Sequence, residues 1–267
     1  MADRARWFNT KTGLYEIVTV DDVSIKHFTK NDKFKCINPT CNVDMNLRNS
    51  SKGGFAFSSY PGQAKNHVDL TNCIRNSLTF QSAKYCEGKF FFNEFVQKLL
   101  YDRSSSPSGR AQKSTKSNKT INNDPRPALR GLSSFYRMVA SKSKNDIYNG
   151  QRVGDMFYDS ENYNEFVMNP TGYKVLECSY YHPIYKEKAF IINFPIDNRH
   201  FNGSTVKIII KNREYFNKLA NEIFSGSKHI EPLVIAGEWI RNDIPNSGYI
   251  AYCVISSERQ LAYLKYL

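Results

Sequence analysis

STVKIIIKNREYFNKLANEIF, residues 204–224, decides the fold class, because the spacing of its apolar residues changes halfway along. In the first half Val206, Ile208 and Ile210 alternate with other residues, which is the period of a strand with one buried face. In the second half the apolar residues recur at helical spacing, and Asn212 is placed to cap the helix. The helical repeat comprises Phe216, Leu219, Ala220 and Ile223. The stretch therefore predicts a strand that leads directly into an amphipathic helix.

Four more strands are expected around this stretch, because four runs are rich in the aromatic and β-branched residues that suit a pleated surface. They are YKVLECSYY (173–181), KAFIINFPI (188–196), LVIAGEWI (233–240) and YIAYCVIS (249–256). The resulting order is three strands, one helix and two strands. This order resembles the oligonucleotide/oligosaccharide-binding (OB) fold, a five-stranded barrel. Gly237, inside the fourth strand, suits a coiled or bulged barrel strand. An α+β sandwich with one helix on an antiparallel sheet is the alternative.

The composition predicts an α+β protein of two modules joined by a linker. We expect a small N-terminal module over residues 1–102, a flexible basic linker over 103–127 and the barrel domain over 128–267, which begins with a helix. The linker is rich in Ser, Asn and Lys and has one large aliphatic residue, so it has too little apolar surface to fold. The 267 residues carry a net charge of +12, and residues 103–126 hold six basic residues against one acidic residue. Such a balance favours polyanionic partners.

No apolar run is long enough to span a bilayer, and the first residues lack the apolar core of a signal peptide, so we expect a cytoplasmic protein with no membrane partner. Six cysteines in such a protein indicate metal binding or burial, and not a disulfide framework.

Four of the potential ligands fall in one N-terminal stretch. Cys36 and Cys41 are spaced C-x4-C, and His67 and Cys73 are spaced H-x5-C. Thiolates and an imidazole suit Zn²⁺, and four protein ligands would close a tetrahedral site, so the expected zinc is structural. Cys86 is a possible substitute ligand. The alternative interpretation is that the cysteines are small buried apolar residues and that the histidine lies at the surface.

This stretch resembles the zinc-finger-like head of competence-protein-type nuclease families. FKCINPTC matches the first ligand pair, NHVDLTNC matches the second, and FAFSS (Phe55–Ser59) occupies the place of an aromatic segment between them. Those families often carry a restriction-type nuclease core. This sequence departs from them because it has no D…E-x-K arrangement on consecutive strands, so nuclease activity is not carried over.

The expected function is binding of single-stranded DNA or RNA, without catalysis. Such strands are held by aromatic rings that stack on bases and by cations that follow the phosphates. The candidate residues on the barrel are Lys174, Tyr180, Tyr181, Tyr185, Lys207, Lys211, Trp239 and Arg241. One alternative is a protein-interaction module, such as a phage-encoded inhibitor or an adaptor. A divergent nuclease is the other. The sequence does not determine an oligomeric state.

Overall fold

The computed structural model describes residues 2–26, 28, 32–49, 54–60, 63, 66–68, 70–101, 124–194, 205–224, 232–245 and 247–263. The chain forms two compact units. The first comprises Met1–Phe80, Tyr136–Ser141 and Leu264–Leu267, and the second comprises Gln81–Phe135 and Lys142–Tyr263. This division differs from the expected boundary after residue 102, since the segment 81–101 belongs to the second unit. Residues 103–123 of the expected linker lie outside the described residues.

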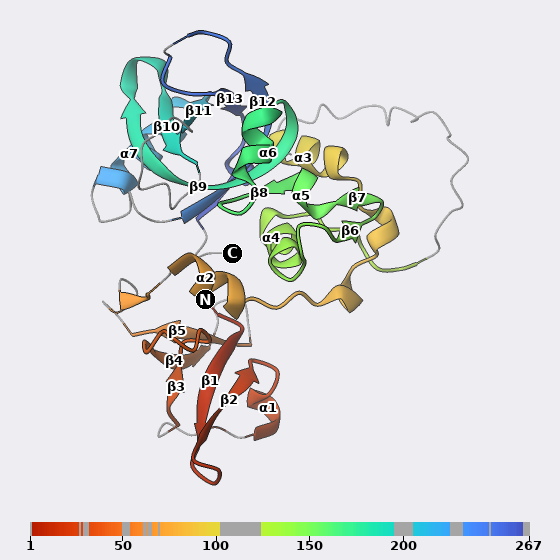
Figure 1. Ribbon diagram of the computed structural model, residues 1–267, viewed down its shortest axis with the longest axis vertical. Helices are drawn as coiled ribbons and strands as arrows, with labels where there is room; N and C mark the ends of the chain where they lie inside the picture. The colour runs from red at the N-terminus through yellow and green to blue at the C-terminus, as the bar shows by residue number, and fades with distance from the viewer. Residues whose placement is uncertain are drawn as a thin grey trace. The chain divides into compact units, whose positions relative to one another are not determined.

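The first unit is built on a five-stranded antiparallel sheet with the order β2-β1-β3-β4-β5 (Figure 1). Its strands are β1 (Arg4–Asn9), β2 (Leu14–Thr19), β3 (Phe34–Lys35), β4 (Asp44–Asn49) and β5 (Phe55–Ser59). Two helices accompany the sheet, α1 (Val23–Lys26) and α2 (Leu70–Ser77). One face buries Ala5, Val18, Phe34 and Phe57 together with three cysteines. The other face is the more exposed one.

The second unit contains a closed five-stranded barrel, as the sequence predicted, and not an open sandwich. Its strands are β9 (Gly172–Ile184), β10 (Ala189–Asn193), β11 (Thr205–Ile210), β12 (Pro232–Arg241) and β13 (Ala251–Ile255). Around the ring the order is β9-β10-β11-β13-β12, and β12 pairs back onto β9. All pairings are antiparallel except the one between β11 and β13. The ring of strands is visible in Figure 1.

Strand β9 is longer than predicted, because it continues through His182 and Pro183 to Ile184. His182 pairs with Ile191 while Tyr180 pairs with Ile192, so Tyr181 is the extra residue of a β-bulge. A bulge bends and twists its strand, and that curvature helps a short sheet to close on itself.

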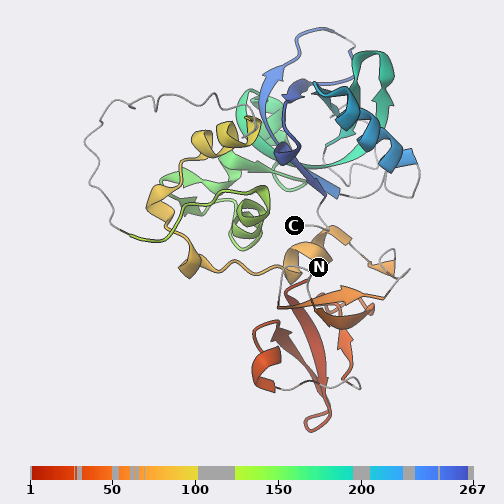
Figure 2. The same cartoon turned by 180° about the vertical axis from the view of Figure 1, so that it is seen from behind.

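Helix α7 (Arg213–Phe224) lies between β11 and β12 in the chain, and its apolar face packs on the barrel core (Figure 2). The side chain of Asn212 accepts a hydrogen bond from the Tyr215 amide at 3.0 Å, which is the expected N-cap. The core itself is aromatic: it includes Phe190, Phe194, Phe216 and Trp239. Among the described residues, no helix has both the length and the apolar character needed to cross a lipid bilayer.

The rest of the second unit lies mainly to one side of the barrel (Figure 1). It contributes α3 (Phe92–Leu100), α5 (Val153–Met156), α6 (Tyr163–Met168), the hairpin of β6 (Ile147–Tyr148) and β7 (Gln151–Arg152), and the short edge strands β8 (Phe157–Tyr158) and β14 (Leu261–Tyr263). Short 3₁₀ turns span Ser82–Lys84, Glu87–Lys89, Tyr185–Glu187 and Glu258–Gln260. Helix α4 (Leu132–Ala140) crosses the division between the units after Phe135. The hairpin turns at Asn149-Gly150, where both residues have positive φ, as a type I′ turn requires.

Candidate metal centre and barrel surface

The four predicted metal ligands lie together in the first unit. The ligand atoms of Cys36, Cys41, His67 and Cys73 are all within 4.8 Å of one another. The Cys41 sulfur lies 3.3 Å from Nδ1 of His67. The three cysteines are buried and the histidine is half-buried. Cys86, the possible substitute, is buried in the second unit and is not in this group.

Local hydrogen bonds shape the first ligand pair into a knuckle. Cys36 follows β3, and the Cys41 amide donates to the Asn38 carbonyl at 3.0 Å to close a turn. The Asn38 side chain accepts from both the amide and the hydroxyl of Thr40, which forms an Asx turn between the two cysteines. Arg6 on β1 then donates to the carbonyls of Cys36 and Cys41, each at 2.7 Å. One guanidinium thus connects the knuckle to the sheet.

The electrostatics of the group suit metal coordination. Burial raises the pKa of Cys36, whereas in Cys41 the effect of burial is outweighed by hydrogen bonds, and its pKa is lowered. Those hydrogen bonds come from the amides of Val43 and Val68 and from the neighbouring thiols. Burial lowers the pKa of His67, which keeps its imidazole neutral, as a ligand must be. The cluster therefore holds one readily formed thiolate and one neutral imidazole.

The arrangement fits a tetrahedral metal site. With bonds of about 2.3 Å to sulfur and about 2.0 Å to nitrogen, the ligand atoms of such a site lie roughly 3.5–3.8 Å apart. The observed spread of up to 4.8 Å and the sulfur–nitrogen distance of 3.3 Å bracket these values. All six cysteines are free thiols, so no disulfide competes for these sulfurs. The donor set is chemically that of a soft or borderline divalent ion.

The candidates on the barrel fall into two groups, and the first group is buried. Trp239 is 1% exposed, packs edge-to-face against Phe166 at 5.8 Å and donates its indole N–H to the Lys174 carbonyl at 3.2 Å. Lys174 is 6% exposed, and its ammonium donates to the Tyr158 hydroxyl at 3.2 Å. Neither side chain offers a surface to a nucleic acid, so this part of the prediction is corrected. The reason is that Trp239 belongs to the barrel core, and Lys174 is buried beside Tyr158.

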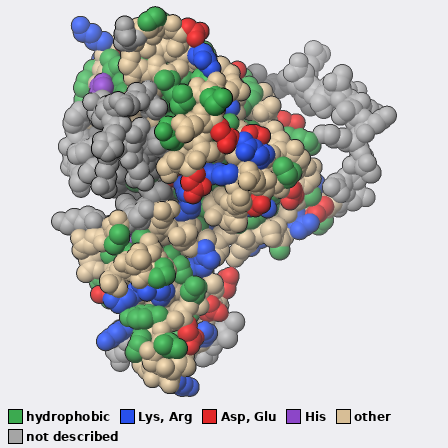
Figure 3. Space-filling view, viewed as in Figure 1, with side chains coloured by type: hydrophobic (Ala, Val, Ile, Leu, Met, Phe, Trp, Pro, Cys, Tyr) green, Lys and Arg blue, Asp and Glu red, His purple; other side chains and the backbone are tan. Residues whose placement is uncertain are grey.

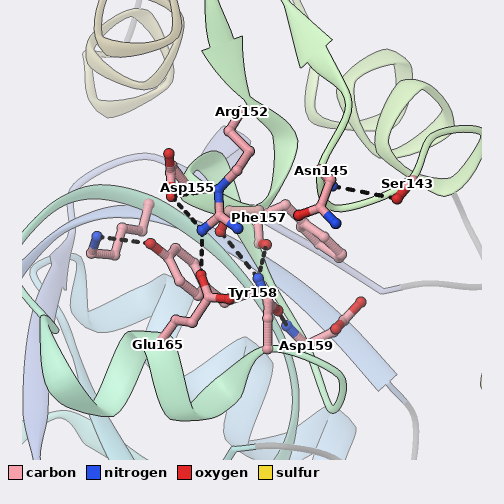
Figure 4. A network of polar contacts seen from close by, with 11 residues as sticks. Ser143, Asn145, Arg152, Asp155, Phe157, Tyr158, Asp159 and Glu165 are labelled. Carbon is pink, nitrogen blue, oxygen red and sulfur yellow. Dashed lines mark hydrogen bonds and ion pairs between the residues drawn. The ribbon is translucent and has the colours of Figure 1, made fainter.

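Figure 4 shows the polar network that covers this part of β9. The Arg152 guanidinium bridges Asp155, at 2.8 Å, and Glu165. Burial raises the pKa of Tyr158 to about 12 and lowers the pKa of Lys174, so the pair is held in a poorly hydrated position. The network joins α5 to α6 beside the strand, where Lys174 is buried.

Lys207 is 7% exposed, but its position is informative. Its ammonium pairs with Glu187, in the turn between β9 and β10, and lies 5.0 Å from the ring centroid of Tyr249. Burial opposes its charge, but Glu187 and Tyr249 outweigh that effect and the pKa of Lys207 is raised. Lys207 therefore does not meet solvent directly. It joins the β9–β10 turn to the loop before β13, and this loop carries a half-buried tyrosine that the sequence analysis did not select.

The remaining candidates are exposed or lie outside the description. Tyr185 is 58% exposed, and Lys211 and Arg241 are exposed. The side chains of Tyr180 and Tyr181 are outside the described residues. Arg241 donates to the Met168 carbonyl at 2.7 Å and borders an open depression of about 420 Å³. The depression is lined by the β12–β13 loop, including Ile244, Ser247 and Tyr249, and by Val167 and Pro170.

In the first unit, Figure 3 shows Lys and Arg side chains interspersed with apolar ones on the visible face. On the exposed face of its sheet, Phe8 and Tyr15 pack at 5.3 Å, and the Arg6 guanidinium lies 5.4 Å from the Tyr15 ring.

Comparison with known proteins adds no family to this description. No protein-family model, curated protein or solved structure matches the chain.

Proposed function

We propose that the second unit is an OB-type domain that binds single-stranded DNA or RNA. The observation that carries the proposal is the order of the strands in the closed ring. The fourth strand, β12, returns to lie beside the first, β9, while β9, β10 and β11 follow one another. That is the Greek-key order, and an OB barrel is a five-stranded Greek-key barrel.

OB domains bind their ligands on the face of the second and third strands, between the loops that follow the first and the fourth strands. In this chain those strands are β10 and β11, and the loops are 185–188 and 242–250. Three exposed candidates fall on this region: Tyr185 in the first loop, Lys211 after β11, and Arg241 before the second loop. Tyr249 lies in the second loop. The buried Lys207 connects the two loops, because its ammonium pairs with Glu187 in the first loop and lies over the Tyr249 ring in the second. Aromatic rings and cations together on one surface are the combination that stacks bases and neutralises phosphates.

We propose that the metal of the first unit is zinc and that its role is structural. Three thiolates and one imidazole complete a four-coordinate site, which has no open position for a substrate. The ligands come from distant parts of the unit, after β3 and on α2, so a bound ion joins segments that otherwise share a small core. The free energy of zinc binding then contributes to the free energy of folding of this unit.

A titration of the full chain with labelled oligothymidylate of about 20 nucleotides tests the nucleic-acid proposal, because OB domains cover roughly 4–16 nucleotides. We expect binding that weakens steeply as salt rises from about 50 to 200 mM. Tyr185→Ala should weaken it by about 1–3 kcal/mol, the usual contribution of one stacked base. Tyr60→Ala, which removes an exposed ring from the first unit, is the control. Salt-independent binding, or equal losses in the two variants, contradicts the proposal.

A protein partner is the second candidate function, and one observation favours it. Leu14 and Ile17 are exposed on β2, which forms an edge of the sheet in the first unit. Exposed edge strands with apolar side chains favour strand addition by another chain. Pull-down with nuclease-treated lysate, repeated with Ile17→Lys, tests this candidate. A protein retained by the wild type and lost from the variant supports it.

A further inference from the structure

The second unit has a cleft of about 760 Å³ away from the loops of the barrel face. It is bounded by α3 on one side and by the segment Pro125–Arg130 on the other, with Arg259 at its end. Both walls and Arg259 belong to the second unit, so the cleft lies within one compact body.

Hydrogen bonds connect the segments next to the cleft. The Lys89 ammonium donates to the carbonyls of Asp124 and Arg126, and the Cys86 amide donates to the Pro127 carbonyl at 2.9 Å. Arg259 donates to the carbonyl of Lys98 at 2.8 Å and to that of Tyr101 at 3.5 Å. A cation at the C-terminal end of a helix satisfies carbonyls that have no partner in the helix. These contacts fix the shape of the cleft before any ligand binds.

The cleft is strongly cationic. Five basic side chains line it against one carboxylate, that of Glu94: Lys89, Lys98, Arg126, Arg130 and Arg259. Arg126 is neutralised by Asp124 next to it, at 2.5 Å. Lys98 forms an exposed i,i+4 pair with Glu94, a kind of pair that contributes little energy. Arg130 is exposed and has no ion pair among the residues that the structure describes. The cleft therefore has uncompensated positive charge that can bind an anionic ligand.

Aromatic rings accompany the cations. Tyr101 is 73% exposed at the C-terminal end of α3, and Phe91 lines the same cleft. Arg259 donates to the Tyr101 carbonyl, so the exposed ring and a cation lie at the same end of α3. Cations beside a solvent-facing ring match a phosphate followed by a base, whereas an acidic peptide would use the cations alone.

The sequence beside the cleft has the same sign of charge. Residues 102–123, which follow Tyr101 in the sequence, contain five basic residues and one acidic residue, Asp102. The charge of the cleft is thus continuous in sequence with the most basic stretch of the protein.

We infer that this cleft holds a second segment of a single-stranded nucleic acid, with phosphates on Lys98, Arg130 and Arg259 and a base on Tyr101. The inference rests on the proposed function of the barrel and adds a contact to it. Each phosphate contact on a single strand adds about 0.7 to the slope of log affinity against log salt. Loss of two cations should therefore lower that slope by about 1.4 and weaken binding about tenfold at about 200 mM salt, and more at lower salt.

The test compares two charge-matched double variants of the full chain in the oligothymidylate titration. Lys98→Ser with Arg130→Ser removes one lysine and one arginine from the cleft. Lys218→Ser with Arg213→Ser removes the same charges from α7, and Lys218, like Lys98, takes part in an exposed ion pair. We expect the tenfold loss and the smaller salt slope in the cleft variant, and less than about a twofold change in the control.

The outcomes separate the two proposals. If both double variants lose affinity equally, the cleft is not a contact, and the barrel proposal stands if Tyr185→Ala still weakens binding. If the wild type binds no single strand, both proposals fail. Photo-crosslinking of bound oligothymidylate supplies a readout that does not depend on affinity: a crosslinked peptide containing Tyr101 supports the inference, and crosslinks confined to barrel peptides oppose it. Competition by polyglutamate at equal charge would show that the cleft takes acidic peptides and would overturn the nucleic-acid assignment.

Discussion

The Cys41 sulfur lies 3.3 Å from Nδ1 of His67, a residue 26 positions further along the chain. The two groups approach from a knuckle and from the segment before α2, and Cys36 and Cys73 complete the cluster. Four such ligand atoms within reach of one another are the arrangement that a metal ion requires, and the proposed zinc leads to direct measurements.

The purified protein should contain one zinc ion per chain, and Cys73→Ser should lose it. Elemental analysis measures the metal content. The matched control is Cys86→Ser, which removes a buried thiol from the second unit and should leave the zinc in place. Retention of zinc by the Cys73 variant, or its loss from both variants, would refute the assignment.

Metal removal should unfold the first unit selectively. The chain has two tryptophans, and Trp7 lies in the first unit, where its indole donates to Asp32 at 2.7 Å, while Trp239 lies in the barrel. A chelator should therefore shift the fluorescence of the wild type and leave that of Trp7→Phe unchanged. If the chelator changes the fluorescence of Trp7→Phe as much as that of the wild type, metal removal affects the second unit, and the prediction is wrong.

Arg6→Ala should weaken zinc binding about tenfold to a hundredfold, because its guanidinium holds the carbonyls of both knuckle cysteines and outer contacts of this kind orient metal ligands. Competition with a coloured chelator measures the change. Arg48→Ala removes an exposed arginine from β4 of the same sheet and should have no effect.

Trp239→Phe should lower the free energy of unfolding by about 2 kcal/mol, because it removes buried volume and leaves the Lys174 carbonyl without its donor. Affinity for oligothymidylate should not change. Tyr185→Ala should behave in the opposite way, with a loss of affinity and little loss of stability, since its ring is largely exposed. Urea denaturation and the binding titration together distinguish the two residues. If Trp239→Phe weakens binding without loss of stability, Trp239 belongs to the binding surface after all.

Gly237→Ala should cost about 1–3 kcal/mol by overpacking, because an added Cβ would lie 3.0 Å from the Cys253 sulfur and 3.1 Å from its Cβ. Cys253→Ala removes the nearer atom. In a double-mutant cycle the two changes should be less destabilising together than the sum of the single changes. If the two changes in the free energy of unfolding are additive, contact with Cys253 is not the reason for a glycine at position 237.

Stability should fall between pH 10 and pH 12, and Tyr148→Phe should reduce the fall. Burial raises the pKa of Tyr148 from 10.0 to about 12. Below the lower value the phenol is protonated in both states, and the full stabilisation is present. As pH rises through this window the phenol ionises in the unfolded chain first, which favours unfolding. The urea midpoints of the wild type and the variant should be similar near neutrality and should differ most near the top of the window.

The sequence alone determined the elements of the barrel, because alternating and helical periods are local properties that survive in any tertiary arrangement. It also indicated which Cys and His residues form a group, since Cys36, Cys41, His67 and Cys73 lie together as their spacing predicted. Only the tertiary structure decided which side chains face solvent. Alternation separates two faces of a strand, but it does not show which face closes into the barrel. Trp239 lies in the barrel core against Phe166, and Lys174 is buried beside Tyr158. The contact between Lys207 and Tyr249 and the cationic cleft beside α3 depend in the same way on segments that meet only when the chain has folded.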